Sequence, residues 1–280
     1  MKRARLTAGF GLFAAAAGIL CARAAPGRPE GDEPPVVAQT SLGENACGPC
    51  ATVNALLRAK APWRNALKSL EGETPLNKAQ DLVRRFSRSP SDAYAGEMAY
   101  DSKRGITWRD LTICFNALLS EHQAPPLKGD YLDRQSDESL EDHLRRVHGI
   151  LATSIRKGMP VITSVRSFAP EPREGGDHAW KGLDGHYIVV TAVQDRIDDG
   201  EKGFRFTYAD SFTGKREHGY ANFDEARNFT AAKGDAKIWE WRTDRPFLVV
   251  TAPSLRLGTQ NQPWHLRTII TLNFAVYIPE

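Results

Sequence analysis

The chain has 280 residues, of which 41% are hydrophobic and 25% are charged, and its formal net charge is +3. This composition is ordinary for a globular protein, and the length allows one large domain or two small ones. The small net charge, without a Lys/Arg-rich block containing interleaved aromatic residues, argues against a nucleic-acid-binding surface, and we expect no nucleic acid partner.

The N-terminal residues have the pattern of a secretory signal. Basic residues at positions 2, 3 and 5 precede an apolar run over residues 6–20, and Ala22-Arg23-Ala24 fits a cleavage site. A membrane anchor is the alternative, but the run is shorter than the roughly 20 residues that a spanning helix needs. We therefore expect a signal peptide over residues 1–25, export to the bacterial periplasm or the medium, and no membrane attachment after cleavage.

The residues after the signal divide into a linker and one domain. Residues 26–35 are rich in Pro, Gly and acidic residues, which is typical of a linker, and the domain is expected over residues 36–280. Its first half contains apolar residues at helical intervals. Helices are predicted at residues 48–60, 76–86, 107–118 and 139–157. Gly158 ends the last of them.

Strands are predicted in the second half of the domain, where β-branched and aromatic residues form short runs. The runs lie at residues 161–165, 187–193, 204–209, 247–251 and 268–278. A long loop is expected between the first two, at residues 167–185. Helices followed by strands indicate an α+β fold, in which an N-terminal helical part packs on a C-terminal antiparallel β-sheet.

The segment Cys47-Gly48-Pro49-Cys50 opens the first predicted helix. A thiol at a helix N-terminus meets unpaired backbone N–H groups and the positive end of the helix dipole, which favour the thiolate. The same N–H groups can stabilise an oxyanion. The tetrapeptide is also that of the thioredoxin active site, but the preceding residues form a polar loop instead of a buried strand. Cys47 is therefore a candidate nucleophile, with Cys50 as a competitor.

A nucleophilic cysteine needs a base and a group that orients the base. His186 leads an apolar strand, whereas His143 and His148 lie among polar neighbours on a predicted helix and are expected to be solvated. Asp210 ends the next strand, and residues 194–203 can form a hairpin that brings it near His186. A carboxylate there can hold the imidazole tautomer and stabilise the imidazolium ion.

These residues resemble, in their order, the papain-like cysteine peptidases, and are most similar to the bacteriocin-processing, double-glycine peptidase type. The matching motifs are Gln39, Cys47-Gly48-Pro49, the helix-to-strand passage at residues 155–162, Gly185-His186-Tyr187 and Asp210. The resemblance implies a papain-like fold. It also implies a role for each site residue: Gln39 as oxyanion donor, Cys47 as nucleophile, His186 as base and acid, and Asp210 as the orienting group.

The leading hypothesis is an exported cysteine peptidase-like hydrolase that cleaves a peptide or amide bond in a peptide or protein substrate. Acyl transfer on the same scaffold, dithiol–disulfide exchange at Cys47 and Cys50, and a non-catalytic binding domain are the alternatives. His143 and His148 are five positions apart, which does not suit a metal pair on one helix face. We expect no metal and no cofactor.

Overall fold

The computed structural model describes residues 33–43, 45–172, 178–223, 247–252, 254–255, 257 and 269–279. The chain divides into two units, Met1–Glu33 and Pro34–Glu280, and the fold described below is that of the second unit. The predicted signal peptide, residues 1–25, lies outside the described residues, as do residues 26–32 of the predicted linker.

The predicted helices are confirmed, with ends that differ by a few residues. The α-helices are α1 (Cys47–Arg58), α2 (Pro75–Phe86), α3 (Trp108–Ser120) and α4 (Leu140–Lys157), and short 3₁₀ helices occur at η2 (Gln39–Ser41) and η3 (Trp63–Lys68). The side chains of Thr107 and Ser139 accept hydrogen bonds from the backbone N–H groups three residues later, which caps α3 and α4. Gly158, with φ of 100°, ends α4 in the left-handed conformation that glycine favours.

All strand pairs in the described residues are antiparallel. The strands are β1 (Tyr100–Asp101), β2 (Gly105–Ile106), β3 (Lys128–Tyr131), β4 (Val161–Pro172), β5 (His178–Val193), β6 (Gly203–Asp210), β7 (Lys215–Asn222), β8 (Val249–Thr251) and β9 (Ile269–Tyr277). Sequence patterns missed β1 and β2, which have two residues each, and also β3 and β7, which are largely polar and only partly buried.

The fold-class prediction is wrong, because the strands close into a barrel. The sheet has the order β3-β9-β4-β5-β6-β7-β8, and β8 also pairs with β9. The six strands from β9 to β8 therefore form a closed antiparallel ring instead of the open sheet of a papain-like α+β fold. Strand periodicity indicates that a strand exists but not which partner it takes, and closure here depends on β8, which has three residues.

The loop predicted over residues 167–185 is also a strand pair in the structure. β4 and β5 stay paired from Val161↔Val190 to Pro172↔His178, with one irregularity between Arg166 and Phe168. Glycine and proline in this stretch suggested a loop, but the register continues on both sides of the irregularity. Residues 173–177 lie outside the described residues.

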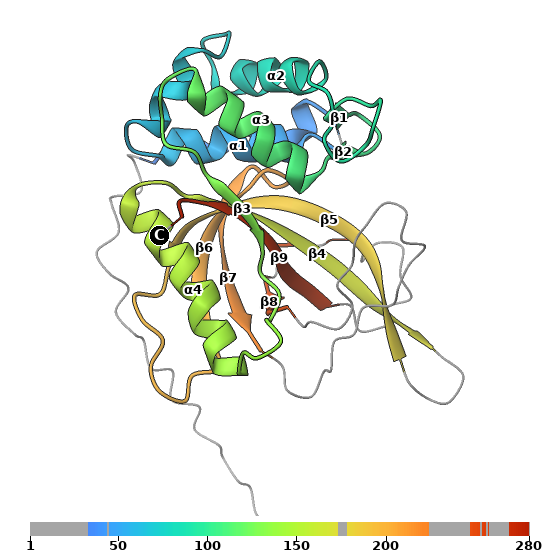
Figure 1. The fold of residues 1–280 in the computed structure, drawn as a ribbon, viewed down its shortest axis with the longest axis vertical. Coiled ribbons are helices and arrows are strands. Elements are labelled where there is room, and N and C mark those ends of the chain that lie inside the picture. The colour runs from blue at the N-terminus through green and yellow to red at the C-terminus, as the bar shows by residue number, and fades with distance from the viewer. Residues whose placement is uncertain are drawn as a thin grey trace, which may run out of the picture. The chain divides into compact units, whose positions relative to one another are not determined.

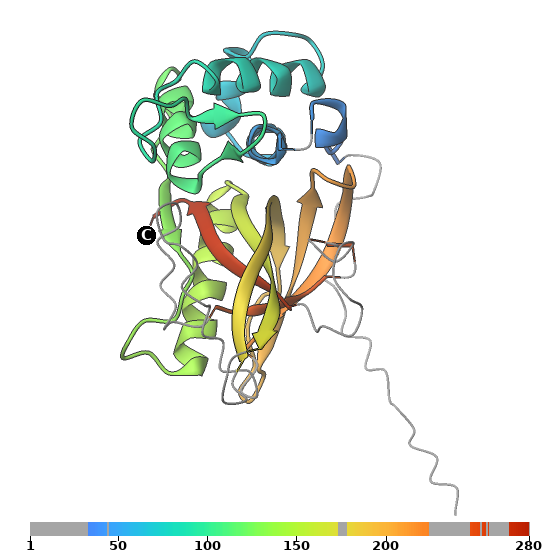
Figure 2. The ribbon, with the colours of Figure 1, turned by 90° about the vertical axis from the view of Figure 1, so that its right-hand side faces the viewer.

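The barrel is covered in two places by helices (Figures 1 and 2). The helices α1, α2 and α3 lie together over one end of the strands. The helix α4 runs alongside the strands. Alternate strand residues serve two cores: Ile162 and Val189 pack with α1, whereas Val161, Ile188 and Val190 pack with the apolar side of α4. The two cores meet at β4 and β5, which carry part of the candidate site.

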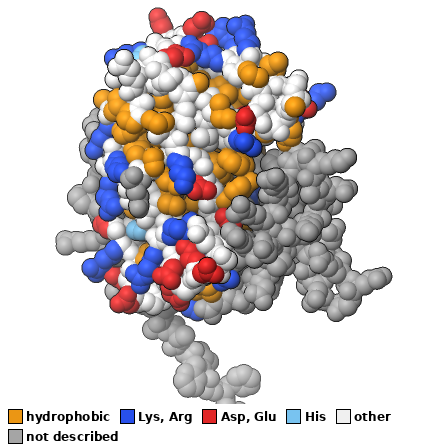
Figure 3. Space-filling view, viewed as in Figure 1, with side chains coloured by type: hydrophobic (Ala, Val, Ile, Leu, Met, Phe, Trp, Pro, Cys, Tyr) orange, Lys and Arg blue, Asp and Glu red, His pale blue; other side chains and the backbone are white. Residues whose placement is uncertain are grey.

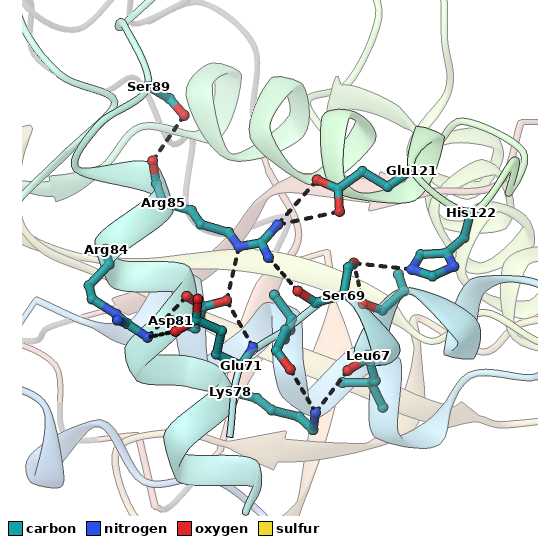
Figure 4. A network of polar contacts seen from close by, with 12 residues as sticks. Leu67, Ser69, Glu71, Lys78, Asp81, Arg84, Arg85, Ser89, Glu121 and His122 are labelled. Atoms are coloured by element: carbon teal, nitrogen blue, oxygen red, sulfur yellow. Dashed lines mark hydrogen bonds and ion pairs between the residues drawn. The ribbon is translucent and has the colours of Figure 1, made fainter. Parts of the chain in front are cut away.

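A polar network joins α2 to its neighbours (Figure 4). The buried carboxylate of Asp81 accepts hydrogen bonds from the Glu71 backbone N–H (3.1 Å), from Arg84 (3.1 Å) and from Arg85 (2.9 Å). Arg85 also contacts Glu121 at the end of α3. These contacts fix α2 against the chain before it and against α3.

The surface is mixed in charge. On the face shown in Figure 3, Lys and Arg side chains are interspersed with Asp and Glu side chains, and hydrophobic side chains gather over its upper part. Among the described residues, none of the helices combines the length and the apolar character that crossing a membrane requires.

Candidate active site

Cys47 is the first residue of α1, and its side chain is partly buried. The preceding Ala46 provides no side-chain cap for the helix. The N–H groups of the first turn are therefore not satisfied by a capping side chain, which suits an oxyanion site. Gly48 makes room for the hairpin β1–β2, because a Cβ atom there would overlap the side chain of Ile106.

His186 and Asp210 lie on neighbouring strands, β5 and β6. The two strands pair through Ile188↔Asp210, and His186 Nε2 lies 2.8 Å from Asp210 Oδ1. Both side chains are buried. The hairpin argument therefore predicted this proximity correctly. His186 does not begin its strand, however, because β5 starts at His178 and His186 pairs with Val165 inside the sheet.

The surroundings of His186 favour its charged form. Burial lowers the pKa of the imidazole, but hydrogen bonds to Asp210 and Cys47 and the charges of these two groups more than offset it, and the pKa is raised to about 9. Asp210 Oδ1 also accepts a hydrogen bond from the Phe212 backbone N–H (2.8 Å). Burial raises the pKa of Asp210, but the contacts with His186 and Phe212 hold it below its ordinary value.

The His186 ring has two partners. Its Nε2 atom lies 2.8 Å from Asp210 Oδ1, and the ring also bonds to the Cys47 thiol. The structure thus brings three of the four predicted site residues together, from the start of α1 and from two adjacent strands. Thiol, imidazole and carboxylate follow one another in the order that a cysteine nucleophile, its base and an orienting acid require.

Gln39, the fourth predicted site residue, lies in η2 on the segment that leads to Cys47. It is buried, and its backbone N–H donates to the Ser211 carbonyl oxygen (2.7 Å), next to Asp210. Asn54 of α1 exchanges hydrogen bonds with both backbone groups of Val37 (2.8 and 3.2 Å), which attaches this segment to the helix. Gln39 is therefore adjacent to the strand end that carries Asp210. Its role as oxyanion donor remains a prediction.

The other two cysteines of the described residues are buried in the same core. Burial raises the pKa of Cys50 to about 12, with a further contribution from Cys47, and burial raises the pKa of Cys114 to about 11. Both groups are thiols at neutral pH, and a thiol is a poor nucleophile compared with a thiolate. Cys50 therefore competes poorly with Cys47 for the nucleophile role.

Two histidines that were expected to be solvated are buried instead. His143 Nε2 lies 2.7 Å from the Leu132 carbonyl oxygen, and His148 Nε2 lies 2.6 Å from that of Gln194. Both lie on the buried side of α4. Their polar neighbours in the sequence lie on other sides of the helix, because successive helical residues point in different directions. Burial lowers the pKa of His143 to about 4, so it is neutral at pH 7 and acts as a structural donor.

Two further residues near the site were not identified from the sequence. Phe212 is 50% exposed, and its ring lies edge-on to the His186 ring with centroids 6.3 Å apart. Asn45 bonds to the hairpin β1–β2. Phe212 could have been identified from the sequence, because it follows Asp210, at the end of a predicted strand, by two positions. No sequence signal connects Asn45 to residues nearly sixty positions away.

A cavity of about 560 Å³ opens between the η2 segment and α2. Its lining residues are Ser41, Leu42, Gln80, Val83 and Arg84. No group of three or more His, Cys, Asp or Glu side chains that could hold a metal ion occurs in the described part of the chain.

Comparison of the chain with protein families, with curated proteins and with solved structures finds no match in any of the three. The assignment of chemistry therefore rests on the residues and the geometry of the site.

Proposed function

We propose that this protein is a cysteine-dependent hydrolase that cleaves a peptide or amide bond in a peptide or protein substrate. Cys47 is the nucleophile, His186 is the base and acid, and Asp210 orients the imidazole. The observation that carries the proposal is the buried His186–Asp210 contact of 2.8 Å in a pair that also contacts the thiol at the start of α1.

The first step is attack of the Cys47 thiolate on the substrate carbonyl carbon. A raised His186 pKa keeps the imidazole protonated at neutral pH, so that it pairs with the thiolate and can then donate its proton to the leaving amine. The oxyanion that forms accepts hydrogen bonds from the N–H groups at the uncapped start of α1. Gln39 supplies a side-chain donor in the same proposal.

The second step is hydrolysis of the thioester formed on Cys47. After donating its proton, His186 takes a proton from water, and the water oxygen attacks the acyl carbon. The bond from that carbon to the Cys47 sulfur then breaks, which releases the acid product and the Cys47 thiolate. Asp210 keeps the ring in one orientation through both steps, and its carboxylate stabilises the imidazolium ion whenever it forms.

Acyl transfer uses the same three residues and differs only in the acceptor. An amine in place of water gives a new amide, so an added primary amine tests this alternative by the products formed. Dithiol exchange is less well supported, because the buried Cys50 thiol is strongly disfavoured as a thiolate and the Cys47 thiol has a histidine–aspartate pair beside it.

The proposal predicts selective reaction of Cys47 with a thiol alkylator. Iodoacetamide should label the full-length protein at Cys47 at neutral pH, and His186→Ala should lower the rate at least tenfold because the thiolate loses its counter-ion. Cys47→Ala should leave no labelled cysteine after residue 25, whereas Cys50→Ala should leave labelling of Cys47 unchanged. Cys21 belongs to the predicted signal peptide and is mapped separately. Peptide mapping by mass spectrometry identifies the labelled residue.

Two results would contradict the proposal. Full labelling of Cys50 in the Cys47→Ala protein would move the nucleophile by three residues. Equal labelling rates in the wild-type and His186→Ala proteins would show that His186 does not activate the thiol. Circular dichroism of each variant verifies that the fold is retained.

A further inference from the structure

Asn45 lies two residues before Cys47, and its side chain is bonded to a distant part of the chain. The amide Nδ2 donates to the carbonyl oxygens of Ser102 (2.9 Å) and Lys103 (3.0 Å). Both carbonyls belong to the turn between β1 and β2. One side chain therefore attaches the segment that enters α1 to the hairpin β1–β2.

Backbone packing places the same hairpin against both sides of the candidate nucleophile. Gly105 has φ of 79°, and a Cβ atom there would lie 3.1 Å from the Asn45 carbonyl oxygen. Ile106 packs against Gly48, the residue after Cys47. The hairpin therefore contacts the chain immediately before and immediately after the thiol.

The hairpin also reaches the strand that carries the candidate base. The Tyr187 hydroxyl, on the residue after His186, donates to the Ile106 carbonyl oxygen (3.3 Å). The chain of contacts Asn45–hairpin–Tyr187 thus runs from the start of α1 to β5. The start of α1 has no side-chain cap of its own, so this connection supplies a restraint that a local cap does not.

We propose that Asn45 is a positioning residue for the thiol chemistry at Cys47: it holds the hairpin β1–β2 between the start of α1 and Tyr187, and so sets the separation of Cys47 from His186. This inference rests on the proposed function. The attraction between a thiolate and an imidazolium ion falls as their separation grows, and a displacement of about 1 Å can cost a catalytic group most of its effect.

The test measures the alkylation rate of Cys47 by iodoacetamide from pH 5 to pH 10 in the full-length protein. In the wild type, the rate at pH 6 should be at least tenfold above that of His186→Ala, because the proposed function pairs the thiolate with the imidazolium ion. Asn45→Ala and Asn45→Leu should lower the rate at pH 6 about tenfold, towards that of His186→Ala, and should lower it less at pH 10, so that the pH profile is shifted. Leu retains most of the volume of the side chain while removing its hydrogen bonds.

Asn116→Ala is the matched control for loss of an asparagine. The Asn116 amide also bridges backbone groups, donating to the Leu127 carbonyl oxygen (2.9 Å) and accepting from the Leu127 N–H (2.8 Å). Its removal should lower the melting temperature without moving the pH profile. A merely structural role for Asn45 would give the same result as this control.

Glycine substitutions test the contact from the hairpin side. Gly105→Ala should push the turn away from Asn45 and reproduce the shifted profile. Gly96→Ala is its control, because Gly96 has a similar φ of 82° but no atom within 4 Å of the position of an added Cβ. Backbone strain is matched in the two variants, and only one of them disturbs the contact.

The outcomes separate this inference from the function on which it rests. A wild-type profile that is the same as that of His186→Ala would overturn the proposed function. A wild-type profile with reactivity at low pH, unchanged in both Asn45 variants and in Gly105→Ala, would overturn the role of Asn45 alone.

Discussion

His186 interacts with two residues of different proposed roles, the carboxylate of Asp210 and the thiol of Cys47. These two contacts determine the charge of the imidazole. Asp210 accepts the hydrogen bond from Nε2, and Cys47 also bonds to the ring. Burial disfavours the imidazolium ion. The ion nevertheless persists at neutral pH, because Asp210 and Cys47 bond to the ring and can both be anionic. The same pair that prepares the thiol also couples protonation of His186 to the stability of the fold.

The stability of the protein should depend on pH through His186. Its pKa rises from 6.5 to about 9 on folding, which corresponds to about 3 kcal/mol. The folded state binds the proton more tightly, so this contribution is fully present below about pH 6.5 and is lost as the pH rises through about 9. Replacing Asp210 with Asn should therefore reduce the free energy of unfolding strongly at pH 6 and weakly at pH 10. Urea titrations at the two pH values measure both differences, and an equal loss at each pH would contradict the prediction.

Individual elements are held in place by polar side chains as well as by apolar packing. α2 contributes no residue to the predicted triad, but it forms one wall of the cavity beside the η2 segment. Its position depends on Asp81, whose side chain is 6% exposed and faces two arginines (Figure 4). Because burial of a carboxylate is costly without partners, the position of α2 depends on the hydrogen bonds that Asp81 accepts.

Asp81→Ala should destabilise the protein by about 2 kcal/mol, because the Glu71 backbone N–H, Arg84 and Arg85 lose the buried acceptor that they share. Glu71→Ala is the matched control. It removes a carboxylate that also contacts Arg84 but is 70% exposed, so its loss should cost less than about 1 kcal/mol. Denaturant midpoints of the two variants give the comparison. Equal losses of stability in the two variants would show that the burial of Asp81 does not determine its contribution to the free energy of unfolding.

On the scale of the whole unit, helices and barrel share their cores. Cys50 and Leu56 of α1 pack with Val189 and Ala209 of the barrel strands, so neither part has its apolar surface covered without the other. The candidate triad crosses the same boundary. The site therefore exists only when the first helix and the barrel are both folded and in contact.

Unfolding of the region Pro34–Glu280 should consequently be one cooperative transition. Far-ultraviolet circular dichroism, which reports mainly the helices, and alkylation of Cys50, which is 0% exposed, should give the same denaturant midpoint. Exposure of Cys50 while the barrel signal in the near-ultraviolet persists would contradict this prediction. Such a result would indicate that α1 detaches from a folded barrel.

The sequence by itself determined much of the local structure and the residue types of the site. Helical periodicity and capping residues such as Thr107 and Ser139 located the helices, since a helix is stabilised by contacts a few residues apart. The hairpin between the strands of His186 and Asp210 was also predictable, because its turn is local. The secretory signal, export and the resemblance to cysteine peptidases remain predictions.

Only the tertiary structure decided which distant segments meet. Closure of the barrel depends on the pairing of β8 with β9, and no periodicity within either strand specifies that partner. Burial of His143 and His148 depends on which side of α4 faces the strands. The contact of Asn45 with Ser102 and Lys103 joins backbone carbonyls, which every residue carries and which leave no trace in the sequence.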